Sequence, residues 1–78
     1  MFRPTMARET MAALIVERVN AQAPEKIEGI HIIDVTSIGS SANWTAGDYW
    51  PPAPEGGLTE IILFSVINYL RHEYDIED

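Results

Sequence analysis

The spacing of apolar residues predicts a helix near the start of the chain, over residues 5–22. Apolar side chains recur there at helical spacing, which places them on one face, at Met11, Leu14, Ile15 and Val19. Thr5 is the expected N-cap, because its hydroxyl can accept a hydrogen bond from an amide of the first turn. Pro24 disfavours continuation of the helix beyond Gln22.

The same reasoning predicts a second helix over residues 59–74, with Thr59 as its N-cap. One face of this helix is apolar and consists of Ile62, Leu63, Val66, Ile67, Leu70 and Tyr74. Ile61 and Phe64 widen the apolar arc on one flank. One short β-hairpin is too small to cover an arc of this width.

Two strands are predicted between the helices, over residues 29–38 and 43–50, since β-branched and aromatic residues there are bounded by turn signals. A turn at 39–42 would join them into an antiparallel hairpin. Residues 51–57 contain three prolines and two glycines and are expected to form a loop.

The alternation of apolar and polar residues within these strands is imperfect. Ile32 and Ile33 are adjacent, which indicates cover on both faces or a bulge near them. Gly47 likewise suggests a bulge in the second strand. We expect Trp44, Ala46 and Trp50 to share one face of that strand, with Trp44 in the core.

These elements predict one domain over residues 1–78, of the α+β class, with an αββα order and both helices on one face of the hairpin. The acidic tail 75–78 follows the negative pole of the last helix and is expected to fray. A lone hairpin has two open edges, so a third strand from another copy of the chain would be favourable.

Composition excludes several classes of protein. The chain has 5 basic and 12 acidic residues, a net charge of −7, and residues 40–78 hold Arg71 against seven carboxylates. Direct nucleic-acid binding is therefore disfavoured. No apolar run is long enough to span a membrane, cysteine is absent, and the start lacks a secretory signal. We expect a cytoplasmic protein.

The order of elements resembles a group of small bacterial proteins of uncharacterised function. The likeness is carried by Asn43-Trp44 opening a strand and by a final helix closing on Tyr74-Asp75-Ile76. The resemblance implies the αββα layout and no assigned activity, so no functional residue is carried over from it.

Candidate residues for chemistry are few. A metal-binding or enzymatic accessory protein could use His31, Asp34 or His72, but the spacing of His72 and Asp75 does not match a helical metal motif. The chain lacks a Gly-x-Ser-x-Gly elbow and a phosphate-binding glycine loop. We therefore expect neither enzymatic activity nor a cofactor or metal.

The excess of large apolar side chains instead favours a non-enzymatic protein-interaction module that binds a second copy or another protein. The residues expected to form the interface are Trp50, Ile61, Phe64, Asn68 and Arg71. A further hypothesis is an acidic inhibitor that mimics nucleic acid. It would require one acidic face containing Asp48, Glu55, Glu73 and Glu77.

Overall fold

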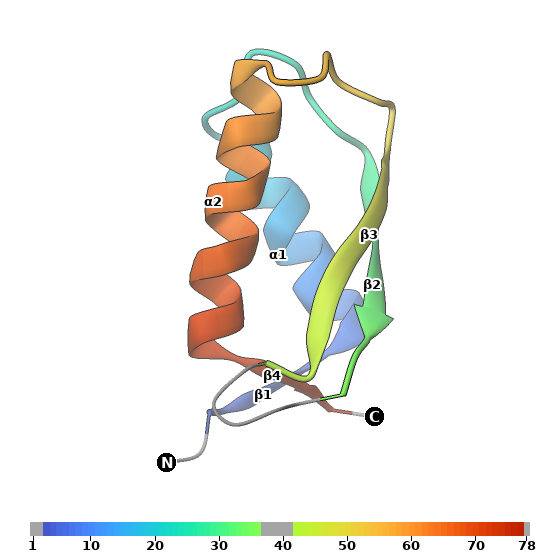
Figure 1. Cartoon of the computed structure of the whole chain (residues 1–78), viewed down its shortest axis with the longest axis vertical. Coiled ribbons are helices and arrows are strands. Elements are labelled where there is room, and N and C mark those ends of the chain that lie inside the picture. Colours follow the sequence, from blue (N-terminus) through green and yellow to red (C-terminus); the bar gives the residue numbers. More distant parts are fainter. Residues whose placement is uncertain (1–2, 37–41, 78) are drawn as a thin grey trace.

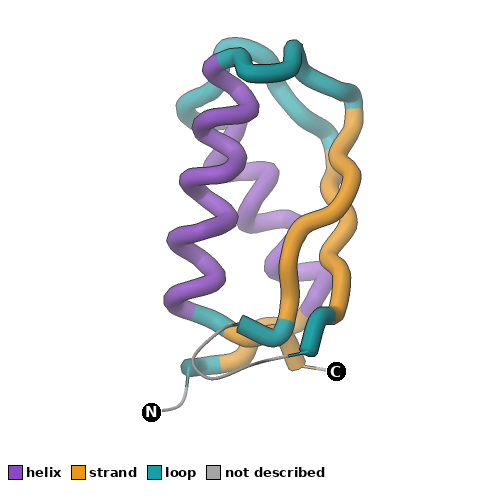
Figure 2. Tube along the Cα trace, viewed as in Figure 1, coloured by secondary structure: helices purple, strands orange, loops and turns teal. Residues whose placement is uncertain are grey.

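The computed structural model describes residues 3–36 and 42–77 and has an α+β fold (Figures 1 and 2). An antiparallel hairpin and two helices form most of it, as predicted, and a small parallel strand pair is added. The elements, in chain order, are β1 (Thr5–Ala7), α1 (Arg8–Asn20), β2 (Gly29–Asp34), β3 (Trp44–Trp50), α2 (Leu58–Glu73) and β4 (Asp75–Glu77).

Both helices lie on the same face of the β2–β3 hairpin, which confirms the predicted layers (Figure 1). Ile30 and Ile32 of β2 are buried against the helices, whereas His31 between them is exposed. Trp44 of β3 is fully buried, as expected. The helices contribute to the same core Met11, Ile15, Val19, Leu63, Val66, Ile67 and Leu70.

The two ends of the described chain pair with each other, which the sequence analysis did not predict. β1 and β4 run parallel, and Thr5 is the partner of Asp75 in the register. The N-cap assigned to Thr5 was therefore wrong, because an extended backbone in this pair delays the start of α1 to Arg8. The expected fraying of the tail was also wrong for residues 75–77, since they form β4 and Ile76 is only 4% exposed, and Asp78 lies outside the described residues.

Side-chain hydrogen bonds attach β4 to the start of β3. The Asn43 amide Nδ2 donates to the Ile76 carbonyl at 3.0 Å, and the Ile76 N–H donates to Asn43 Oδ1 at 2.9 Å. The Trp44 indole Nε1 donates to the Tyr74 carbonyl at 2.9 Å. The two motifs singled out in the sequence thus contact each other, and in this structure they hold β4 against the start of β3.

The start of α2 differs from its prediction. Gly57 occupies the N-cap position, without a side-chain cap, and the helix begins at Leu58. Thr59 is not the cap: it is fully buried, and its hydroxyl donates to Glu25 Oε1 and accepts from the Glu25 N–H. The assignment failed because a threonine before an apolar run signals a cap and a buried polar contact equally well.

A bulge in the hairpin changes which face Trp50 occupies. Ile30 pairs with Tyr49 and Ile32 pairs with Ala46, so β3 carries one extra residue between these pairs. The irregularity lies at Gly47 and Asp48, as Gly47 suggested. The placement of Trp50 on the face of Trp44 was wrong, because the bulge shifts the alternation and moves Trp50 to the outer face of the hairpin.

The limits of the hairpin are narrower than predicted. β2 ends at Asp34 and β3 begins at Trp44. The expected turn lies mostly outside the described residues, as does the last part of the predicted first strand. Residues 51–57 form the expected loop between β3 and α2.

Candidate interaction surface

The outward side of α2 carries four large apolar side chains that are mostly solvent-exposed. The exposed fractions are 57% for Leu58, 57% for Ile61, 54% for Phe64 and 56% for Tyr69. At about 100° per residue these positions span an arc of about 140° opposite the buried face. We call these four residues the apolar face of α2.

Charged side chains are missing from the exposed residues of this stretch. Between Leu58 and Tyr69, the other exposed positions are Ser65 and Asn68, which are uncharged. In a chain with 17 charged residues out of 78, an uncharged face of this size is unusual. Desolvation of the four side chains on contact with another surface would cost little, because none of them is charged.

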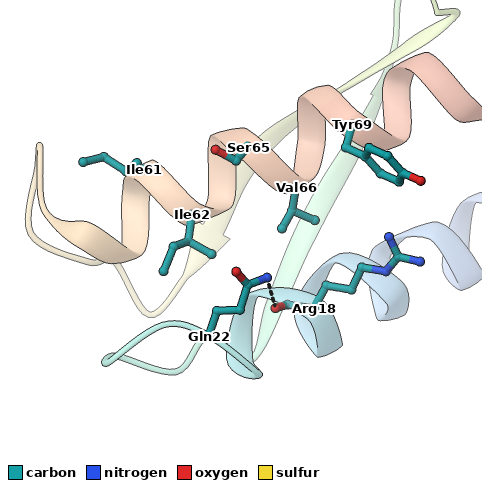
Figure 3. Close-up of a pocket in the computed structure, with 7 residues that line it drawn as sticks. All are labelled: Arg18, Gln22, Ile61, Ile62, Ser65, Val66 and Tyr69. Atoms are coloured by element: carbon teal, nitrogen blue, oxygen red, sulfur yellow. Dashed lines mark hydrogen bonds between the residues drawn. The ribbon is translucent and has the colours of Figure 1, made fainter.

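A groove of about 400 Å³ borders this face, between α2 and the end of α1 (Figure 3). Ile62 and Val66 form its apolar wall, and Arg18 of α1 and Gln22, which follows α1, lie opposite. The Arg18 guanidinium is 5.8 Å from the centre of the Tyr69 ring, within the range of a cation–π contact. Arg18 is the only charged residue among those lining this groove.

The residues predicted for the interface do not all lie together. Ile61, Phe64 and Asn68 follow one stripe of α2 and are exposed. Arg71 continues the stripe but is half-buried, and its Nε donates to the Trp44 carbonyl at 2.8 Å. Arg71 therefore ties α2 to β3 in this structure.

Trp50 lies on a different surface, the outer face of the hairpin. Its indole packs across Gly29, where a Cβ atom would be only 2.2 Å from Trp50 Cζ2. The His31 ring meets it edge-on, with ring centroids 4.9 Å apart. The bulge that turns Trp50 outward also separates it from the stripe formed by Ile61 and Phe64.

Leu58 and Tyr69 are exposed residues of this face that the predicted interface does not include. Their helical positions are about 20° apart, on the flank nearest α1. Their exposure depends on how closely the two helices approach. The spacing of apolar residues along α2 does not reveal the distance between α1 and α2.

The candidate residues for metal binding or catalysis are not brought together. The exposed His31 contacts Trp50, Asp34 forms an ion pair with Arg8, and His72 lies on α2. Asp75 accepts a hydrogen bond from the Asn43 N–H and pairs with Arg3. Within residues 3–36 and 42–77, no three His, Asp or Glu side chains are grouped so that they could hold a metal ion.

The four carboxylates named for nucleic-acid mimicry lie on four separate segments. Asp48 is in β3, Glu55 in the 51–57 loop, Glu73 at the end of α2 and Glu77 in β4. That loop and β4 lie at opposite ends of the molecule, which is 36 Å long (Figure 1). These carboxylates do not form one acidic face.

Comparison with protein-family models, with curated proteins and with solved structures finds no match for this chain. The resemblance to small bacterial αββα proteins thus stays a prediction. No helix in the described part of the chain is both long and apolar enough to cross a bilayer.

Proposed function

We propose that this chain is a non-enzymatic protein-interaction module that self-associates through the apolar face of α2. The observation that carries the proposal is the exposure of Leu58, Ile61, Phe64 and Tyr69 on one uncharged helical face. Clustered aliphatic and aromatic side chains dominate the energetics of protein interfaces when they are desolvated together.

A second copy is the occupant that fits this face best. Two copies with a net charge of −7 each repel one another wherever their carboxylates meet. Between Leu58 and Tyr69 the only charged residue is Glu60, which is half-buried at the edge of the apolar face and accepts a hydrogen bond from the Gly56 N–H, so the face permits close approach. A two-fold axis across the helix would pack this face against itself, since identical patches meet in such a dimer.

Sedimentation equilibrium from low micromolar to near-millimolar protein tests the proposal. We expect a reversible monomer–dimer equilibrium, which Ile61→Gln and Phe64→Gln each shift toward monomer. Each change occurs twice in a symmetric dimer, so the dissociation constant should rise about tenfold or more, tenfold being equivalent to about 1.4 kcal/mol.

The matched control is Ile33→Gln on the outer face of the hairpin. Ile33 is 47% exposed, compared with 57% for Ile61, so the two substitutions remove the same apolar group from similarly exposed positions. Ile33→Gln should leave the equilibrium unchanged. A protein that stays monomeric throughout, or a dimer weakened equally by Ile33→Gln and Ile61→Gln, would contradict the proposal.

A further inference from the structure

A second groove, of about 490 Å³, lies on the other side of α1, between that helix and the start of β2. Its apolar floor comes from Ala12, Ala13 and Val16 of α1 and from Ile30 of β2. Two alanines in succession leave this part of the helix without bulky side chains. The groove shares no residue with the apolar face of α2.

Carboxylates surround this floor. Glu9, Glu17 and Glu28 line the groove and are exposed, whereas no Lys, Arg or His is among the residues that line it. We call it the acidic groove. Glu9 and Glu17 are eight residues apart on α1, which corresponds to about 12 Å along the helix axis.

Trp50, whose ring lies across Gly29 of β2, also lines this groove and supplies its aromatic wall. Its side chain is 42% exposed, so part of the indole is available to a ligand. An indole face attracts a guanidinium or ammonium group, and carboxylates bind guanidinium through paired hydrogen bonds. An apolar floor, an indole wall and three carboxylates together complement a ligand that is both cationic and aliphatic.

We propose that the acidic groove docks a basic amphipathic segment of a partner protein, with two arginines flanking an aliphatic residue. An extended segment rises about 3.3 Å per residue and points alternate side chains to the same face. Arginines four residues apart would therefore lie about 13 Å apart, matching Glu9 and Glu17. The aliphatic residue midway between them would face Ala12 and Ala13. This pattern is Arg-x-Leu-x-Arg.

A second copy of this chain is a poor occupant of the acidic groove, because it brings a net charge of −7. Nucleic acid is repelled for the same reason. The groove beside α2 differs in this respect, since its charged lining residue is Arg18. The two sides of α1 therefore differ in charge. The docking proposal does not depend on self-association through α2.

The test is a titration of the full-length ¹⁵N-labelled chain with the capped peptide Ser-Arg-Ser-Leu-Ser-Arg-Ser, followed by amide and indole NMR signals. We expect the Trp50 indole signal and the amides of α1 around Ala12 and Ala13 to shift. The buried Trp44 indole, bonded to Tyr74, should not shift, and it reports that each variant is folded. A peptide with both arginines replaced by glutamate should not bind.

Two triple variants with the same change in net charge separate specific docking from general attraction. Glu9→Gln/Glu17→Gln/Glu28→Gln should weaken binding about fivefold or more, as expected for the loss of several exposed ion pairs. The control replaces three carboxylates outside the groove: Asp48→Asn/Glu55→Gln/Glu73→Gln. It should retain most of the affinity.

Equal weakening in both triple variants would overturn the proposal, since the peptide would then respond only to overall charge. Shifts centred on Ile61 and Phe64 would also overturn it, by placing the peptide on the apolar face of α2. Absence of any change in the NMR signals at millimolar peptide would overturn the proposal as well.

Discussion

The pair of hydrogen bonds between the Asn43 side chain and the Ile76 backbone provides a test of how β4 is attached to the rest of the fold. Asn43→Ala removes two hydrogen bonds, of 3.0 and 2.9 Å, to the backbone of a residue that is 4% exposed. It leaves one backbone N–H and one C=O without these partners. A buried polar group that loses its partner costs about 1–3 kcal/mol.

The expected total is about 2–4 kcal/mol, taking the lower part of that range for each of the two groups. A chain of this length has a free energy of unfolding of roughly 4–12 kcal/mol, at about 0.05–0.15 kcal/mol per residue. The substitution would therefore remove a large share of the total. A loss of about 2 kcal/mol alone lowers Tm by roughly 8–16 °C in a domain of this size.

The measurement is urea unfolding followed by circular dichroism, at a concentration low enough to keep the chain monomeric. Asn68→Ala is the matched control, because Asn68 is exposed on α2. It should change the free energy of unfolding by no more than about 0.5 kcal/mol. Hydrogen exchange of the Ile76 amide locates the effect, since this amide should be protected in the parent chain and exchange faster in Asn43→Ala. Equal stabilities of the two variants would refute the reasoning.

Two further substitutions test the packing around the hairpin and α2. Gly29→Ala places a methyl group 2.2 Å from the Trp50 ring, so the Trp50 indole must move; its NMR signal should shift while that of Trp44 does not, and an unmoved Trp50 signal would contradict the described packing. Thr59→Val removes a buried hydroxyl that bonds Glu25 and should cost about 1–3 kcal/mol in chemical denaturation. Thr59→Ser should retain most of the stability, and a valine variant as stable as the parent would show that the hydroxyl contact is unimportant.

The core of the fold could be predicted because the burial of its residues follows from the spacing of apolar positions within a single helix or strand. Ile30, His31 and Ile32 alternate at the strand period, and the structure buries the two isoleucines and exposes the histidine. Leu63, Val66, Ile67 and Leu70 recur at the helical period, and all of them are buried. Each periodicity fixes which side of its element faces the core.

The features that the sequence did not predict depend on contacts between distant residues. Thr5 pairs with Asp75, and a strand of three residues is too short to show alternation. Thr59 and Glu25 meet only after α2 packs beside the segment that follows α1. The two wrong N-cap assignments have this common cause, because a threonine's local sequence does not reveal its distant partner.

The candidate surface was partly predictable for a similar reason. Ile61 and Phe64 were identified by counting apolar positions around one helix, and they are exposed in the structure. Trp50 was assigned to the wrong face of β3, because one extra residue at the bulge reverses the alternation beyond it. Gly47 indicated the bulge, but the register between β2 and β3 is needed to tell which face the residues after the bulge occupy.

The two proposed surfaces differ in their electrostatics, and this difference makes their failures separable. The four side chains of the apolar face of α2 are uncharged, whereas the acidic groove holds Glu9, Glu17 and Glu28. At 0.1 M salt the Debye length is about 10 Å, so added salt weakens the attraction between the acidic groove and a cationic peptide. The same screening reduces repulsion between two acidic copies and favours contact through α2. Salt should thus move the two equilibria in opposite directions, because one surface needs its charge to bind and the other binds where charge is lacking.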